Sequence, residues 1–138
     1  TVAVKSKVQR SGLVLIDAAI PRQRVIAFID SGSTTSAGNQ ALMVAASRAK
    51  ALIGGSGPTE LFSVTGQVLA GRSAVLSRLA LGQMTLRNLT VVIGDIHTFE
   101  YWGLQDRPAI VIGADVLRTF DSVAIDLKRN EVRFRIGR

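Results

Sequence analysis

Residues 110–117 read IVIGADVL: three apolar residues, a glycine, an alanine, an acid and two more apolar residues. With Ala109 added, the run 109–112 is continuously apolar, as is typical of a short strand buried on both faces. Gly113 ends this run, and a short helix is expected over 116–120. The stretch therefore predicts a buried strand followed by a turn and a helix.

A second stretch, FIDSGS at residues 28–33, places an acid at the end of another apolar strand. Gly32 permits a tight turn and lets its backbone N–H approach the Asp30 carboxylate. Ser31 and Ser33 can donate hydrogen bonds that orient this carboxylate. Taken alone, the stretch is equally well explained as a turn in which Asp30 caps its own loop.

The composition excludes several kinds of site. The chain has no cysteine, which rules out disulfides, thiolate metal sites and cysteine nucleophiles. A single histidine, His97, rules out a multi-histidine metal centre and disfavours a catalytic triad with Ser33, Thr35 or Ser36. We therefore expect neither a metal nor another cofactor.

The net charge of +7 comes from 17 Lys and Arg that are spread along the chain. No aromatic residues interleave with a basic stripe, so a solvated basic surface is favoured over a nucleic-acid site. An acidic partner or a membrane surface stays open.

The overall pattern predicts a single, mainly β domain over residues 1–138, a small closed barrel or sandwich with one or two short helices. Strands are expected over residues 13–20, 24–30, 60–69, 73–81, 85–93, 109–112, 122–127 and 131–136. A first helix is expected over 39–52, and the glycine-rich residues 54–58 are expected to form a flexible link.

The chain begins at Thr1 without a methionine or a signal-like segment, so we expect the domain to be cut from a longer precursor. No apolar run approaches the ~18 residues that a membrane span needs. Any membrane attachment is expected only through other parts of the precursor, and an exported precursor, periplasmic or membrane-anchored, is favoured.

In this order and spacing, FIDSGS and IVIGADVL resemble the retropepsin-like aspartic peptidases, the single-lobe family of retroviral type. The resemblance extends over residues 13–134. It implies a barrel-like acid-protease lobe with a flap hairpin and a ψ-shaped active-site loop, and it implies that Asp30 is the catalytic acid.

The resemblance also assigns roles to the neighbours of this acid. Ser31 would link two active-site loops across a dimer axis, Gly32 is the glycine of the triplet, and Ser33 stands beside the carboxylate. Gly113 and Asp115 would be the glycine and acid of the ψ loop, where the acid is structural and caps the following helix.

A flap is implied at the hairpin whose bend is expected at residues 66–71. Its candidate substrate-binding residues are Val64, Gly66, Val68, Leu69 and Gly71. Phe99, Tyr101 and Trp102 either line a pocket or anchor their loop on the core. One position departs from the family pattern, because Ala114 stands where retroviral enzymes usually carry an arginine that ties the dimer together.

Aspartic peptidases need two carboxylates that share one proton. This chain has one Asp-Ser-Gly triplet, so the resemblance implies a homodimer to which each copy contributes Asp30. The expected function is hydrolysis of peptide bonds in a protein substrate bound like an added strand. The alternative is a non-catalytic peptide-binding or dimerisation module with the same fold.

Overall fold

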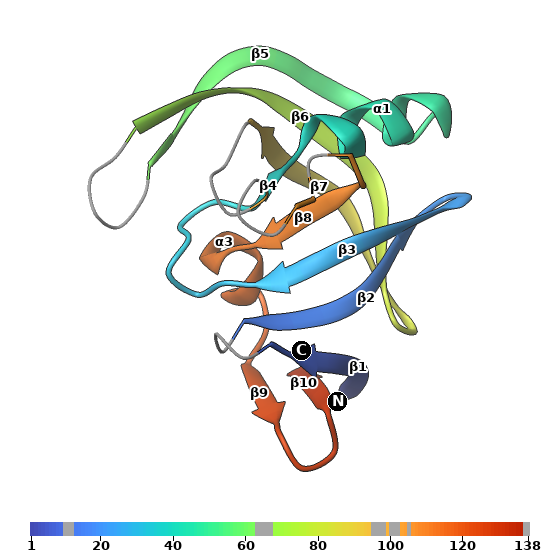
Figure 1. The fold of residues 1–138 in the computed structure, drawn as a ribbon, viewed down its shortest axis with the longest axis vertical. Coiled ribbons are helices and arrows are strands. Elements are labelled where there is room, and N and C mark those ends of the chain that lie inside the picture. Colours follow the sequence, from blue (N-terminus) through green and yellow to red (C-terminus); the bar gives the residue numbers. More distant parts are fainter. Residues whose placement is uncertain (10–12, 63–67, 95–98, 100–102, 105, 137–138) are drawn as a thin grey trace.

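The computed structural model describes residues 1–9, 13–62, 68–94, 99, 103–104 and 106–136, without the side chains of Ser56, Leu61, Phe62, Val68 and Leu69. The strands are β1 (Val2–Val8), β2 (Val14–Ile20), β3 (Gln23–Ile29), β4 (Ala37–Gly38), β5 (Leu52–Phe62), β6 (Val68–Leu81), β7 (Met84–Ile93), β8 (Ala109–Ile112), β9 (Ser122–Asp126) and β10 (Glu131–Arg135). Two short helices, α1 (Gln40–Arg48) and α3 (Ala114–Leu117), lie between them (Figure 1).

Six strands close into a barrel. Hydrogen-bonded neighbours follow the order β2-β3-β8-β4-β7-β6, and β6 pairs again with β2 through Ala18 with Leu81 and Ala19 with Ala80. Closure satisfies the backbone groups that a sheet edge would leave unpaired. The predicted closed, mainly β lobe with short helices is therefore confirmed.

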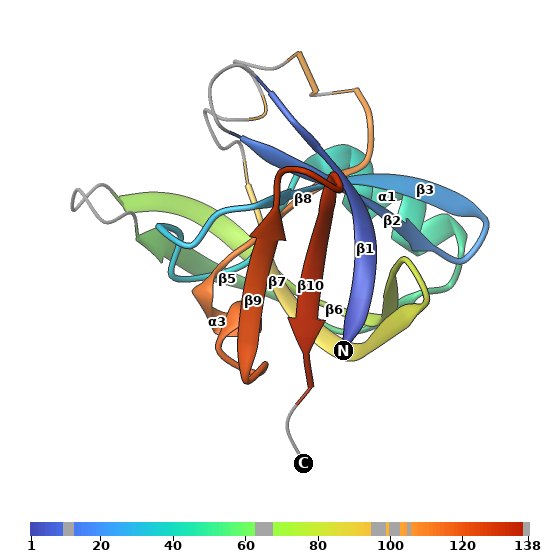
Figure 2. The same ribbon diagram turned by 90° about the horizontal axis from the view of Figure 1, so that it is seen from below.

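Outside the barrel, β1, β10 and β9 lie side by side as an antiparallel sheet (Figure 2). The end of β1 also pairs with β2, which joins this small sheet to the barrel. Among the described residues β9 pairs with β10 alone, so its other side is a free edge.

The parallel pairing of β3 with β8 positions the candidate site. Ile26 lies opposite Ala109 and Ile29 opposite Ile112, so the two strands end side by side. Because parallel strands end at the same edge of a sheet, the segments that follow Ile29 and Ile112 leave the barrel together. All four residues of β8 are buried, as the apolar run predicts.

The glycine-rich residues 54–58 are strand, so the prediction of a flexible link there is wrong. They lie inside β5 and pair with β6 through two register shifts. At Gly55, which has a φ of 90°, a Cβ atom would lie 2.6 Å from the Cα of Ala74. Glycine here permits close approach of the neighbouring strand, a use that composition alone does not separate from a link.

The bend predicted at residues 66–71 overlaps strand β6. Strand β5 ends at Phe62 and β6 begins at Val68, so Gly71 lies within β6 opposite Thr59 and not in the bend. At Gly71 a Cβ atom would lie 2.7 Å from the carbonyl oxygen of Ile93. Val64 and Gly66 lie outside the described residues, as do the side chains of Val68 and Leu69.

Other boundaries differ in smaller ways. Helix α1 ends at Arg48, since β5 begins at Leu52, and α3 covers 114–117 where 116–120 was expected. Strands β1 and β4 were not among the predicted strands, and the partners of β4, which are β7 and β8, are distant in the sequence. No helix of the described chain is both long and apolar enough to cross a bilayer.

Asn39 fixes α1 against the barrel. Its side-chain oxygen accepts hydrogen bonds from the backbone N–H of Leu42 (2.9 Å) and of Ala109 (3.1 Å). Its Nδ2 donates to the carbonyl oxygens of Leu104 (2.7 Å) and Arg107 (2.6 Å). One buried amide thus caps the helix and holds the segment that leads into β8.

Replacing Asn39 with alanine should lower the free energy of unfolding by about 2–4 kcal/mol, because buried backbone groups lose their partners. Gln40→Ala, at the exposed neighbouring position, should change it by no more than about 0.5 kcal/mol. Denaturant titration of both variants measures the difference. Equal stability of the two would contradict this role of Asn39.

Candidate active site

The two loops that follow β3 and β8 are bound to each other through their backbones. The N–H of Asp30 donates to the carbonyl oxygen of Ile112 (3.0 Å), which extends the strand pairing by one residue. The N–H of Ala114 donates to the carbonyl oxygen of Ser33 (2.7 Å). The Asp30 loop therefore rests directly on the start of α3.

Asp115 and Ser36 lock this arrangement. The Asp115 carboxylate accepts hydrogen bonds from the backbone N–H of Ser36 (3.0 Å to each oxygen) and from its hydroxyl (2.8 Å). The Ser36 oxygen in turn accepts from the N–H of Gly113 (3.0 Å). Because Ser36 is fully buried, these bonds are shielded from water and hold the loops in one register.

The predicted capping role of Asp115 is only a part of what its carboxylate does. It does accept a bond from the N–H of Val116 (2.8 Å), but the residue that caps α3 is Gly113. Its remaining hydrogen bonds go to Ser36, which lies 79 residues away in the sequence. Asp115 is thus chiefly a link between the two loops.

The close contact between the Asp30 loop and the start of α3 requires glycine at position 113. A Cβ atom at this position would lie 2.7 Å from the carbonyl oxygen of Ser33 and 2.9 Å from the carbonyl carbon of Thr35. Both neighbours are backbone atoms, which cannot move without displacing the loop. A side chain here would push the Asp30 loop away from α3.

Asp30 itself is exposed at the outer end of this structure. The N–H of Gly32 donates to its Oδ1 (3.0 Å), the approach that the sequence predicts. The N–H of Ser33 donates to the carbonyl oxygen of Asp30 (3.2 Å) and closes the turn. The carboxylate is therefore held by its own loop and still faces solvent.

The two serines of the loop do not orient this carboxylate, contrary to expectation. The Ser33 hydroxyl donates to the carbonyl oxygen of Thr35 (2.8 Å) and so supports the loop instead. The Ser31 side chain is exposed, and its hydroxyl has no hydrogen-bond partner within the described part of the chain.

Two contributors were not predicted in these roles: Ser36, considered only as a nucleophile, and Asn39. A signal exists for Asn39, because an asparagine before an apolar helical pattern is a common helix cap. Among the described residues, no group of three or more histidines, cysteines or acids could hold a metal ion.

Of the three aromatic residues singled out, Phe99 is described. It is buried, and its ring lies 6.5 Å from that of Phe28 in strand β3. This contact favours the interpretation that its loop is anchored on the core. His97, Tyr101 and Trp102 lie outside the described residues.

No protein-family model and no curated protein matches the chain. Among solved structures, it is similar to a retropepsin-like aspartic protease from Rickettsia conorii, with a TM-score of 0.56 and 15% sequence identity. The match covers 98% of this chain and 89% of that one. At this identity the likeness shows the fold, which is that of a retropepsin-like lobe, and the activity has to be argued from the residues.

The bond between Ser36 and Asp115 can be tested with a double-mutant cycle. Ser36→Ala and Asp115→Ala should couple by about 1–3 kcal/mol in the free energy of unfolding, since both remove the bond between the Ser36 hydroxyl and the Asp115 carboxylate. Ser33→Ala, whose hydroxyl bonds Thr35 instead, should couple with Asp115→Ala by less than about 0.5 kcal/mol. Coupling energies of similar size in both cycles would contradict the assignment.

Proposed function

We propose that this protein is an aspartic endopeptidase in which Asp30 is the catalytic carboxylate. The observation that carries this proposal is the position of Asp30, exposed and held by the N–H of Gly32 on two interlocked loops. A turn that only caps itself has no need of a second, buried loop that fixes its position. The similarity of the fold to a retropepsin-like aspartic protease from Rickettsia conorii supports the same conclusion.

The proposed reaction needs two such carboxylates. With one proton shared between them, one carboxylate accepts a proton from a bound water while the other donates to the carbonyl oxygen of the scissile bond. One chain supplies a single Asp30, so we propose that a second copy supplies the other across a two-fold axis. The unpartnered hydroxyl of Ser31 is then free to bond with the facing loop.

The free edge of β9 is the surface that we assign to this second copy. Ile125 is 45% exposed and Leu127, in the following turn, is 66% exposed. An exposed edge strand with large apolar side chains invites pairing with another chain. Strand β9 also begins five residues after α3 ends, so a partner at this edge would lie close to the interlocked loops.

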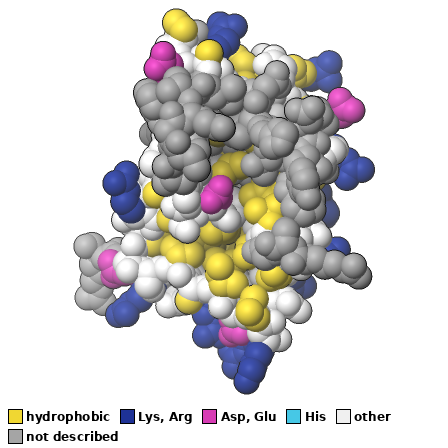
Figure 3. All heavy atoms as spheres, turned by 60° about the vertical axis from the view of Figure 1, so that its left-hand side comes forward, with side chains coloured by type: hydrophobic (Ala, Val, Ile, Leu, Met, Phe, Trp, Pro, Cys, Tyr) yellow, Lys and Arg dark blue, Asp and Glu magenta, His cyan; other side chains and the backbone are white. Residues whose placement is uncertain are grey.

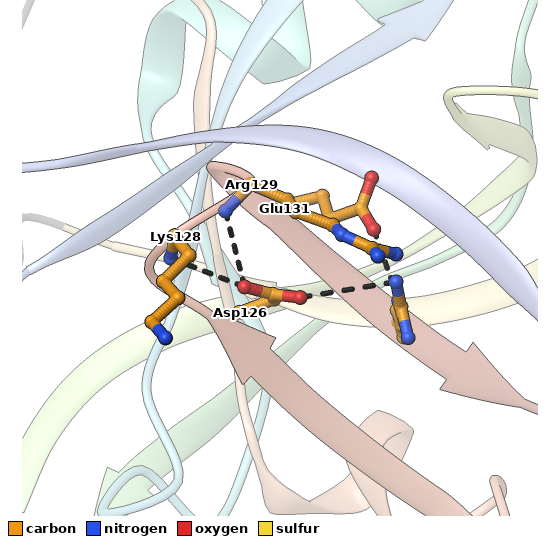
Figure 4. Close-up of polar contacts among 5 residues, drawn as sticks. Asp126, Lys128, Arg129 and Glu131 are labelled. Carbon is orange, nitrogen blue, oxygen red and sulfur yellow. Dashed lines mark hydrogen bonds and ion pairs between the residues drawn. The ribbon is translucent and has the colours of Figure 1, made fainter.

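The hairpin that presents this edge is held by polar contacts (Figure 4). Asp126 accepts hydrogen bonds from the backbone N–H of Lys128 (3.1 Å) and of Arg129 (3.0 Å). The Nη2 of Arg133 lies 3.8 Å from the Oδ2 of Asp126, and the Nε of Arg133 donates to the Oε1 of Glu131 (2.9 Å). Ion pairs of half-buried surface side chains contribute little stability, but the two backbone bonds fix the turn.

The substrate is proposed to be an extended segment of protein with apolar side chains at the cleavage site. Figure 3 shows the side of the molecule that is on the left in Figure 1, where the β3–β4 loop and α3 lie. Hydrophobic side chains gather in the middle of this face. The long β5–β6 hairpin reaches out on the same side and could pair with a bound strand.

Replacing Asp30 with asparagine should lower the rate at which an unfolded protein substrate is cleaved by about 10²-fold or more, because the carboxylate pair that shares a proton is lost. Asp121→Asn, at another exposed acid, should leave the rate unchanged. Cleavage is followed by mass spectrometry, with a denaturation curve to show that both variants fold. Undiminished cleavage by Asp30→Asn would rule out the proposed mechanism, and peptide binding without cleavage by the unmodified protein would favour the binding module.

Ile125→Lys should convert the dimer to a monomer and abolish cleavage, because two added charges would face each other at the β9 edge. Val44→Lys, on the exposed face of α1, should leave both the dimer and the activity intact. Sedimentation velocity and the same cleavage assay measure these effects. An active monomer would contradict the shared site, and an unaffected dimer would place the interface elsewhere.

A further inference from the structure

A basic hollow of about 550 Å³ lies away from the candidate active site. It is formed by the β2–β3 turn, the end of α1, and the paired strands β6 and β7. Five cationic side chains line it: Arg22, Arg48, Lys50, Arg78 and Arg87. The other lining residues are Pro21, Ala49 and Ser77, so none of the described residues around the hollow is acidic.

None of the five forms an ion pair within the described part of the chain, although Asp106 lines the adjoining hollow with Arg22 and Arg48. The ion pairs of Arg133 with Asp126 and Glu131 lie on the β9–β10 hairpin and involve none of these five side chains. Across the strands, Arg78 lies directly opposite Arg87, a like-charge pair that destabilises a sheet in the absence of a counter-charge.

At two of the five positions, the backbone conformation also favours glycine over a long cationic side chain. Arg22 has a φ of 67° and Lys50 a φ of 55°, in the left-handed region that glycine and asparagine adopt most readily. Pro21 followed by a left-handed residue is the pattern of a type II turn, which prefers glycine at the second position. Lys50 follows the end of α1, where glycine is also preferred. A long cationic side chain at either position costs conformational free energy relative to glycine. We attribute its presence to a contact that its charge makes.

We propose that this hollow binds a compact anion carrying two or more phosphate groups. Each phosphate group has three acceptor oxygens and a charge between −1 and −2, which suits a small hollow lined by several cations. Four of the five cations are arginines, whose planar guanidinium groups bind phosphate through two parallel hydrogen bonds. The volume lies within the range of small-molecule sites.

The position of the hollow separates it from substrate binding. The β2–β3 turn lies at one end of β3, and Asp30 follows the other end (Figure 1). A seven-residue strand spans roughly 20 Å. The bound anion therefore leaves the active-site loops free, and its binding does not depend on the proposed peptidase activity.

Isothermal titration with inorganic tripolyphosphate at about 0.15 M salt tests the proposal. The double variant Arg22→Gly, Lys50→Gly should bind at least about tenfold more weakly, because two charge-assisted contacts are lost. Glycine suits the left-handed backbone at both positions, so this variant should fold at least as stably as the unmodified chain. A thermal denaturation curve checks this.

The matched control removes the same charge elsewhere. Lys128→Gln, Arg129→Gln on the β9–β10 turn should change the affinity by less than about twofold, because distant exposed charges are screened. An equal loss in both double variants would overturn the proposal, since the binding would then follow net charge alone.

A second experiment distinguishes a lipid headgroup from a free anion as the source of the phosphate groups. Co-sedimentation with phosphatidylcholine vesicles, with and without cardiolipin, tests a lipid headgroup as the ligand. Binding to cardiolipin vesicles that is lost in Arg22→Gly, Lys50→Gly supports a site for headgroup phosphates, and binding to tripolyphosphate alone supports a free anion. Absence of binding to both probes would overturn the site.

Discussion

The hydrogen bonds between Ser36 and Asp115 are the constraint on which the candidate site depends. Parallel pairing of β3 with β8 brings two loops to the same edge of the barrel, but pairing alone leaves their conformations open. The buried Ser36 hydroxyl bonds the carboxylate of one loop and the backbone of Gly113, and Gly113 lets the two backbones touch. The backbone of Asp30 is held by its bonds to Ile112 and Ser33, while its own side chain stays exposed.

Part of the candidate site could be predicted from local sequence patterns. The apolar run 109–112 and the turn at Asp30 carry their patterns within a few residues, and both lie where the sequence places them. The roles of Ser36 and β4 could not be deduced in this way, because the partners of Ser36 lie 77 and 79 residues away and β4 is only two residues long. The glycines of β5 were wrongly predicted to form a flexible link for a related reason. Local composition does not indicate that another strand packs against them.

The two ends of β3 differ in character. At one end lies an exposed acid on interlocked loops, which we propose to be half of a symmetric site, with the exposed Ile125 at the β9 edge as the proposed contact with the second copy. At the opposite end, five cations line a hollow whose described lining contains no acid, and we propose that it binds phosphate groups. Part of the net charge of +7 is therefore concentrated in one place.

The central claim is that two copies of Asp30 form one catalytic site, and mixing experiments test it directly. Protomers of the unmodified chain and of Asp30→Asn are combined at constant total concentration and allowed to exchange before cleavage is measured. If a mixed dimer holds one carboxylate and is inactive, the rate falls with the square of the unmodified fraction. A rate that falls in simple proportion to that fraction would show that one chain suffices and would contradict the shared site.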